Sequence, residues 1–308
     1  MRSRLLTVLL TCLLAGLLAG CSLLLPQPTD APPVQTTPPT TTVPPTTVPP
    51  TTQPPVTTLP PAPKIGWIEE GGKKYYYNEN SVMLTGWQEI DEQRYYFKES
   101  GVMATGKVEI DGQSRYFGSD GSEIILVNPW NFTPEDYDPE IVDINGWQYS
   151  NAICYDALME MLQACKDAGF QPYIASAYRT HGDQTWLYNN KIHRLIAEGY
   201  SEADARKLAG TVVAVPGTSE HELGLAFDLV DDSYRNLDEA QENTPVQKWL
   251  MENSWEYGFI LRYPNDKSEA TGIIYEPWHY RYLGKYLAKE VYDSGLCLEE
   301  YLNNLTDE

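Results

Sequence analysis

Residues 217–228 read GTSEHELGLAFD, and this stretch decides how the rest of the chain is interpreted. Its histidine, His221, is followed seven residues later by Asp228, which lies in an otherwise apolar run typical of a buried strand. A carboxylate in such a strand is costly unless it is paired or bound to a metal. We therefore expect Asp228 to meet a cation. Gly224 and Ala226 are expected on the same strand face, leaving space for a metal or a substrate.

A second stretch, YEPWHYRY at residues 275–282, supplies further candidates. The chain has four histidines, so a histidine-based metal site must draw on His181, His193, His221 and His279. Two imidazoles and one carboxylate, with the fourth position open, form a recognised catalytic zinc arrangement. Glu276 lies three residues before His279 and is the kind of unligated carboxylate that a metal-activated water requires as general base.

Together the two stretches resemble the VanY-type D-alanyl-D-alanine carboxypeptidases, within the group that also holds the lysostaphin-like and hedgehog-like zinc folds. The pattern Ser-x-His-x-x-Gly-x-Ala-x-Asp occupies residues 219–228, and Glu-x-Trp-His occupies residues 276–279. The similarity extends upstream to SAYRT at residues 176–180 and to Gln184, and downstream through YGFILRY at residues 257–263. Every catalytic position that the family pattern expects has a matching residue type.

The resemblance covers most of residues 140 to 285 and implies a zinc peptidase domain over residues 125–308. Its fold class would be α+β, with a central antiparallel sheet and flanking helices. The cofactor would be Zn²⁺. By resemblance, the zinc ligands are His221, Asp228 and His279, the catalytic residues are Glu276 and Arg179, and the substrate-binding residues are Arg179, Gln184 and Ser219. His181 and His193 match no ligand position and are expected on the surface or on a helix.

The reaction implied by the resemblance is removal of the C-terminal D-alanine from peptidoglycan stem peptides. Arg179 would stabilise the oxyanion or hold the terminal carboxylate of the substrate, because arginine is permanently charged and forms paired hydrogen bonds. An L,D-carboxypeptidase acting on tetrapeptide stems is an alternative, since residues 275–282 also resemble those relatives. A non-catalytic wall-binding lipoprotein is a third hypothesis. Glu276 weighs against it, because a binding-only domain gains nothing from a general base.

The N-terminal region has the composition of an export signal and a spacer. Basic residues and a short apolar run end in LAGC at residues 18–21, which resembles the bacterial lipobox and predicts lipidation of Cys21. Residues 22–63 are rich in proline and threonine and are expected to be a disordered linker that reaches into the cell wall. The sequence thus predicts a lipid-anchored protein on the extracellular face of a bacterial membrane.

Residues 64–124 contain an internal repeat with a period of about twenty residues. Trp67 and Trp87 occupy equivalent positions, and Lys107 stands where the third repeat would have tryptophan. Alternating aromatic residues predict one β-hairpin per repeat, stacked on its neighbours. These repeats resemble the wall-binding repeats of choline- and glucan-binding proteins, which implies a wall polymer, glucan or choline as ligand. The alternative is that the aromatic residues only pack the repeats together.

The charge of the chain excludes one class of partner. The formal net charge is −21 at pH 7, and no basic stripe is present, so we expect no nucleic acid to bind. Cys154 and Cys165 are expected on one face of a helix, too far apart for a disulfide, and are predicted to be buried thiols.

Local patterns predict the elements of the peptidase domain. A capping box at residues 244–247 should begin a helix that Gly258 closes. Residues 259–263 and 272–275 suggest a hairpin. The other expected elements are helices over residues 151–169, 183–197 and 286–294 and a strand over residues 172–178.

Overall fold

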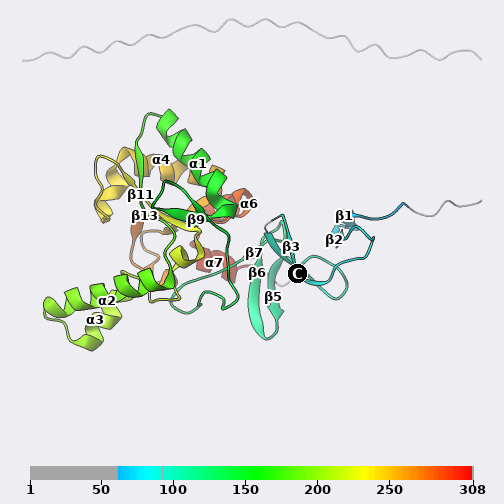
Figure 1. Ribbon diagram of the computed structural model, residues 1–308, viewed down its shortest axis with the longest axis horizontal. Coiled ribbons are helices and arrows are strands. Elements are labelled where there is room, and N and C mark those ends of the chain that lie inside the picture. The colour runs from blue at the N-terminus through cyan, green and yellow to red at the C-terminus, as the bar shows by residue number, and fades with distance from the viewer. Residues whose placement is uncertain (1–61, 92, 307–308) are drawn as a thin grey trace, which may run out of the picture. The chain divides into compact units, whose positions relative to one another are not determined.

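The computed structural model describes residues 62–91 and 93–306 of the chain. The predicted lipobox with Cys21 and nearly all of the predicted linker lie outside these residues. The mixture of helices and strands confirms the α+β class, with small antiparallel hairpins preceding the larger part of the chain (Figure 1). No helix within the described ranges is long and apolar enough to cross a membrane.

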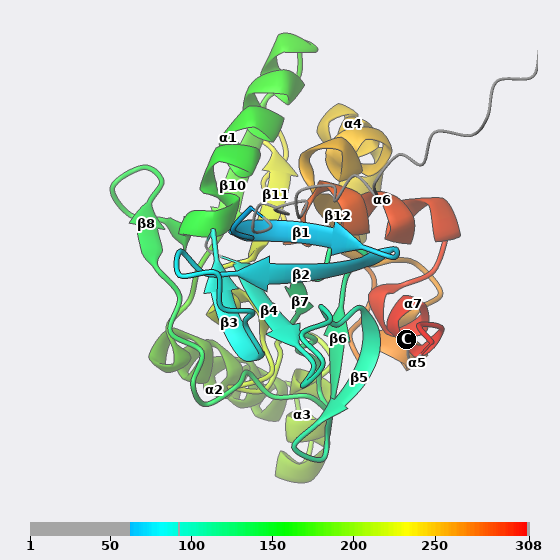
Figure 2. The same ribbon diagram turned by 90° about the vertical axis from the view of Figure 1, so that its right-hand side faces the viewer.

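Each repeat forms one antiparallel hairpin, as the sequence predicts. Trp67 of the first hairpin contacts Tyr95 of the second, with ring centroids 5.0 Å apart, so neighbouring hairpins share their aromatic side chains. The hairpins are the blue to blue-green strands in Figure 2. Trp87 contacts Phe117 of the third hairpin in the same way, at 5.8 Å. The strands of this region are β1 (Gly66–Glu70), β2 (Lys73–Tyr77), β3 (Gly86–Ile90), β4 (Gln93–Phe97), β5 (Gly106–Ile110), β6 (Gln113–Phe117) and β7 (Glu123–Ile124).

A four-stranded sheet forms the centre of the larger part, in the order β10 (Pro172–Ser176), β11 (Ala226–Asp231), β13 (Glu276–Tyr282) and β12 (Phe259–Tyr263). All neighbouring strands are antiparallel. Every residue of β11 is buried, which is expected when both faces of a strand are covered. A small hairpin of β8 (Ile141–Asp143) and β9 (Tyr149–Asn151) leads into the first helix.

The helices cover the sheet through separate apolar clusters. The largest cluster joins α1 (Ala152–Asp167) and α4 (Pro245–Asn253) to sheet residues that include Phe227 and Tyr280. A second cluster packs α6 (Lys285–Ser294) and α7 (Leu298–Asn303) against Ile260 of β12. A third holds α2 (His181–Ala197) to α3 (Glu202–Ala209), which lie on the other side of the sheet from α1 and α4 (Figure 1).

Short helical turns connect several of these helices and strands, and two predictions were wrong at these turns. The structure places η1 (Glu220–Leu223) before β11, and Gly224 ends η1 at φ 70° instead of lying in the strand beside Asp228. The helix α4 ends at Asn253, and Gly258 closes a separate turn, η3 (Ser254–Tyr257). Another turn, η2 (Glu239–Asn243), precedes α4.

The predicted hairpin was wrong in its second strand. Residues 272–275 are not in a strand, because α5 (Ser268–Thr271) and the left-handed Gly272 occupy the connection. The partner of β12 is β13, and Phe259 pairs with Tyr282 at its far end. Helices α3 and α7 were not predicted. The predicted helices over 151–169, 183–197 and 286–294 correspond to α1, α2 and α6.

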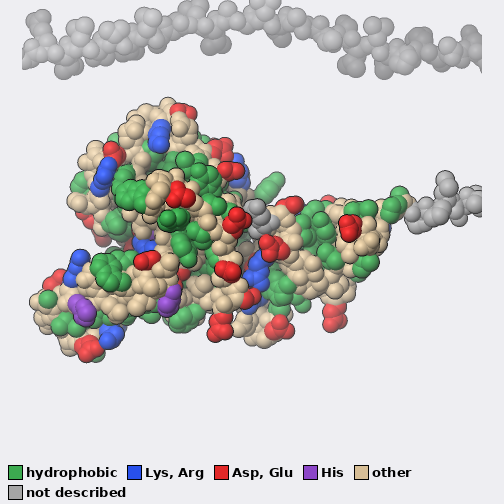
Figure 3. Space-filling model, in the orientation of Figure 1, with side chains coloured by type: hydrophobic (Ala, Val, Ile, Leu, Met, Phe, Trp, Pro, Cys, Tyr) green, Lys and Arg blue, Asp and Glu red, His purple; other side chains and the backbone are tan. Residues whose placement is uncertain are grey.

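The buried thiols agree with the prediction for Cys154 and Cys165. Cys154, Cys165 and Cys297 are buried free thiols. Acidic side chains are spread over the face seen in Figure 3, and lysine and arginine side chains form no stripe on that face.

Candidate metal centre

Strand pairing brings two of the predicted ligands together. Asp228 of β11 lies directly opposite His279 of β13. Because side chains alternate along a strand, the neighbouring pair, Phe227 and Tyr280, points into the core on the other face. The same alternation that places Phe227 in the core therefore turns Asp228 and His279 toward the site.

The third predicted ligand comes from the turn before β11. His221 lies in η1, and the left-handed Gly224 then reverses the chain into the strand. A Cβ at position 224 would lie 2.8 Å from the backbone nitrogen of Asn151, so only glycine fits this turn. His221 Nδ1 hydrogen-bonds the Ala177 carbonyl oxygen at 2.8 Å, which directs Nε2 toward Asp228.

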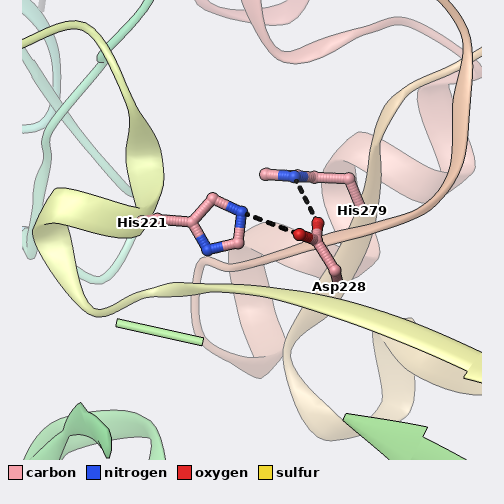
Figure 4. A group of neighbouring side chains, drawn as sticks. All are labelled: His221, Asp228 and His279. Atoms are coloured by element: carbon pink, nitrogen blue, oxygen red, sulfur yellow. Dashed lines mark hydrogen bonds and ion pairs between the residues drawn. The ribbon is translucent and has the colours of Figure 1, made fainter. Parts of the chain in front are cut away.

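The three side chains meet in a buried group (Figure 4). His221 Nε2 lies 3.3 Å from Asp228 Oδ2, and His279 Nδ1 lies 3.1 Å from Asp228 Oδ1. One ligand atom from each residue lies within 4.8 Å of the others. Zinc binds such ligands at about 2.0–2.2 Å in tetrahedral geometry, which places ligand atoms roughly 3.3–3.6 Å apart. The group fits a zinc ion once its most widely separated ligand atoms move closer together.

The charges and pKa shifts of the three side chains favour the binding of a cation. Burial and the nearby Arg179 charge lower the pKa of His221 to about 4, so its imidazole is neutral at neutral pH. Although burial opposes it, the carboxylates of Asp228 and Glu220 raise the pKa of His279 to about 9. Burial would also raise the pKa of Asp228, but the neighbouring imidazoles and Arg179 hold it well below its usual range. A metal would therefore replace a proton on His279 as it binds.

Glu276 reaches the site because β13 is irregular. Glu276 and His279 are three residues apart, a spacing that puts side chains on opposite faces of a regular strand. The register of β12 against β13 shifts between Leu261 and Tyr263, and Glu276 Oε2 consequently lies 3.6 Å from His279 Nδ1. Such irregularities often re-aim side chains beside active sites. Burial raises the pKa of Glu276 to about 8, and the Asp228 charge adds to the effect.

Arg179 is also in the site, although its contacts differ from those expected. Its Nη2 donates to Asp228 Oδ2 at 2.9 Å, its Nη1 to Gln184 Oε1 at 3.2 Å, and its Nε to Ser176 Oγ at 2.9 Å. Gln184 is fully buried, and its Nε2 donates to the Ala214 carbonyl oxygen. Gln184 therefore holds Arg179 in place, and both of its polar atoms have protein partners.

The other predicted residues lie at different distances from the centre. Ser219 is buried immediately before η1. His181 begins α2, is exposed, and pairs with Glu222 at 2.8 Å, while His193 is exposed on the same helix. As expected, neither histidine belongs to the metal group.

Sequence reasoning missed a buried charged network below the ligands. Glu220 Oε1 accepts hydrogen bonds from Arg262 at 2.7 Å and from Arg281 at 2.8 Å. Arg262 also donates twice to Glu299 of α7, at 2.8 and 2.6 Å. Burial acts to raise the pKa of Glu220, but the two arginines hold it below its usual range. The sequence did contain a signal for this network. Arg262 and Arg281 are charged residues in apolar strands, and the same conflict with apolar surroundings identified Asp228.

Known proteins similar to this chain have the activity that the resemblance in the sequence implied. Residues 148–285 match the family described as VanY, D-alanyl-D-alanine carboxypeptidase. A D-alanyl-D-alanine carboxypeptidase of Enterococcus faecalis is 43% identical over 180 residues, which are 58% of this chain and 65% of that protein. This chain thus spans slightly less than two thirds of that relative.

Solved structures give the same result. A vancomycin resistance D,D-pentapeptidase VanY variant in complex with Zn(II) is 44% identical, with a TM-score of 0.54, and the match covers 58% of this chain and 98% of that one. The LdcB LD-carboxypeptidase is 32% identical, with a TM-score of 0.53, over 66% of this chain and 95% of that one.

The N-terminal repeats match two further families. Residues 84–130 match a choline-binding repeat, and residues 65–80 match a putative cell wall binding repeat. These matches agree with the hairpins and their shared aromatic side chains. The matched region 148–285 contains the metal group, Glu276 and Arg179. The chain belongs to the VanY family of D-alanyl-D-alanine carboxypeptidases, and choline-binding and cell wall binding repeats precede its peptidase region.

Proposed function

We propose that this protein is a zinc-dependent D,D-carboxypeptidase that removes the C-terminal D-alanine from peptidoglycan stem peptides. The observation that carries the proposal is the buried Glu276 carboxylate, 3.6 Å from a histidine of a His-Asp-His group. His221, Asp228 and His279 would hold the ion. The Zn(II) complex of the VanY variant supports this choice of metal. A wall-binding module without catalysis would not need Glu276.

The roles of the protein groups follow from their positions. When bound, zinc lowers the pKa of a coordinated water and polarises a carbonyl group. Glu276 accepts the proton of the attacking water and later delivers it to the departing D-alanine amine. Its raised pKa suits both tasks, because it can hold the proton near neutral pH. Arg179 stabilises the developing oxyanion or binds the terminal carboxylate of the substrate.

The D,D specificity is supported by the relatives. The D,D-pentapeptidase VanY variant is 44% identical to this chain, whereas the LD-carboxypeptidase LdcB is 32% identical. Both have the same fold, so the fold itself does not decide between the two bonds. L,D-carboxypeptidase activity on tetrapeptide stems is therefore the second candidate function of this protein.

The test is mass spectrometry of muropeptides after incubation with the zinc-loaded protein. Pentapeptide stems should lose one D-alanine, while tetrapeptide stems should remain intact. The Glu276→Gln variant, which keeps the size of the side chain, is the control for contaminating activity. Shortening of tetrapeptides alone would establish the L,D alternative. Zinc binding without cleavage of either stem would contradict the enzymatic proposal.

For the repeats, we propose binding to choline or a related group of a wall polymer. Trp67 is 40% exposed and lies 5.1 Å from Tyr76 and 5.0 Å from Tyr95, measured between ring centroids. Such an arrangement of aromatic faces suits a quaternary ammonium group. Within the ranges that the structure describes, no lysine or arginine lies over the Trp67 ring.

The equivalent group around Trp87 differs. The guanidinium carbon of Arg94 lies 4.9 Å from the Trp87 ring centroid, and that of Arg115 lies 5.8 Å away. Glu123 contacts both arginines, at 3.3 and 3.4 Å, and so holds them over the ring. The second aromatic group is therefore occupied by cations of the protein itself. Equilibrium dialysis with choline should show that Trp67→Ala abolishes binding and that Trp87→Ala has a much smaller effect. If glucan binds instead, the wall ligand is a sugar.

For the location, we propose lipid attachment through Cys21, with the Pro/Thr-rich residues 22–63 as a spacer into the wall. The support is the LAGC sequence after an apolar run. A Cys21→Ser variant should fail to incorporate labelled fatty acid. Equal labelling of the variant and the parent protein would disprove the proposed anchor.

A further inference from the structure

Glu220 is the residue immediately before a proposed zinc ligand, yet its carboxylate contacts the other histidine. Its side chain is fully buried, and Oε1 accepts from both Arg262 and Arg281. Among the residues that the structure describes, neither Glu220 Oε2 nor the buried His279 Nε2 has a hydrogen-bond partner, and the two atoms lie 3.6 Å apart. A buried carboxylate oxygen, which can accept a hydrogen bond, thus faces a buried ring nitrogen.

The orientation of His279 determines what its Nε2 must do. Nδ1 faces Asp228 at 3.1 Å and is therefore the nitrogen available to the metal. A neutral imidazole that binds a metal through Nδ1 carries its proton on Nε2. That N–H needs an acceptor, and Glu220 Oε2 is the acceptor in front of it. A movement of about 0.5 Å would bring the pair into the usual hydrogen-bond range.

The two proposed histidine ligands differ in their outer partners. His221 Nδ1 contacts the neutral carbonyl oxygen of Ala177, whereas His279 Nε2 faces a carboxylate. A carboxylate partner fixes the tautomer of a ligand histidine and increases its basicity more strongly than a neutral acceptor. This carboxylate is kept charged by its surroundings, because Arg262 and Arg281 together balance Glu220 and Glu299.

We propose that Glu220 is a positioning residue that accepts a hydrogen bond from His279 Nε2–H and thereby increases the affinity of the site for zinc. The inference rests on the proposed zinc site. It assigns a role to the residue between Ser219 and His221, while the reaction itself is performed by other groups.

The decisive variant is Glu220→Gln, measured against the matched control Glu299→Gln in the full chain. In Glu220→Gln the two arginines should retain the amide oxygen, so the amide NH₂ turns toward His279 Nε2 and places a donor against a donor. Zinc affinity, measured by competition with a chromophoric chelator, should fall by roughly 10–100-fold. Glu299→Gln removes a carboxylate from the same network but does not contact His279, and its zinc affinity should match that of the parent protein.

The outcomes separate this inference from the proposed function. If the parent protein binds no zinc, the proposed zinc site fails. If it binds zinc and both variants retain the parent affinity, or lose the same factor, the positioning role of Glu220 is disproved. Substitution with Co(II) gives an independent readout, since the visible spectrum should change in Glu220→Gln and not in Glu299→Gln.

A measurement on the unaltered protein decides the matter if Glu220→Gln does not fold. The chain has four histidines, so nitrogen-15 labelling of histidine gives few signals. His181→Gln and His193→Gln, at exposed positions, identify two of them. In the zinc-loaded protein, His279 should carry its proton on Nε2, with a slowly exchanging N–H. A proton on Nδ1 would overturn the inference.

Discussion

Replacement of Arg262 by leucine should cost the protein much of its stability. Arg262 is fully buried and donates three hydrogen bonds, one to Glu220 and two to Glu299. Within the part of the chain that the structure describes, leucine would leave Glu220 with the Arg281 guanidinium and Glu299 with the Asn128 amide as hydrogen-bond donors from side chains. The variant therefore keeps two buried carboxylates against one arginine.

The size of the effect follows from that imbalance. Removing one partner of a buried ion pair costs about 3–5 kcal/mol, because the charge that remains is uncompensated. For a folded region of this size, each kcal/mol lowers the melting temperature by about 2–4 °C, so the shift should be roughly 6–20 °C. Thermal unfolding followed by circular dichroism would measure it.

A second variant tests the cause. Arg262→Leu combined with Glu299→Leu removes one charge of each sign, so it should recover most of the lost stability. If Arg262→Leu lowers the unfolding free energy by less than about 1 kcal/mol, as exposed pairs do, the buried network does not carry the stability assigned to it. A double variant that is less stable than Arg262→Leu would also refute the reasoning.

Three further outcomes are expected. Glu276→Gln should retain zinc and the fold but lose about 10²–10⁴-fold in turnover on pentapeptide stems, and near-normal turnover would show that another group is the base. Arg179→Lys should lower kcat/KM at unchanged zinc content, because lysine cannot replace three directed donors to Asp228, Gln184 and Ser176. Kinetics equal to those of the parent protein would show that Arg179 has no role in the reaction. Gly258→Ala should lower the melting temperature, since Gly258 has φ 89° and a Cβ would lie 2.8 Å from the Tyr282 ring, and an unchanged melting temperature would show that the turn adapts.

The metal group could be predicted from sequence because its residues conflict with their surroundings. Asp228 in a buried strand and His279 in a run of aromatic residues both require a polar partner. The position of Gly224 was predicted wrongly, because the apolar run suggested a longer strand and the turn η1 depends on contact with Asn151, far away in the sequence. The second strand of the hairpin was wrong for a similar reason, since Gly272 permits a left-handed turn after a short helix.

The charged network was harder to predict, since it joins residues that are distant in the sequence. Glu220 lies in an apparently polar Glu-His-Glu stretch, and its burial depends on the direction that η1 gives to the side chain. Glu299 looks like a surface residue of a terminal helix. The sequence does not show that the two share Arg262 as a partner.

The place of Glu299 also ties the docking of a peripheral helix to the interior of the sheet. Glu299 lies in α7, outside the four-stranded sheet, yet it supplies two of the three hydrogen-bond contacts of the fully buried Arg262 in β12. Detachment of α7 would leave the Arg262 guanidinium with Glu220 as its remaining carboxylate among the described residues, which is costly for a buried charge. The docking of α7 and the folding of β12 are therefore expected to be cooperative. A chain cut before residue 298 should unfold at a lower temperature than the parent protein.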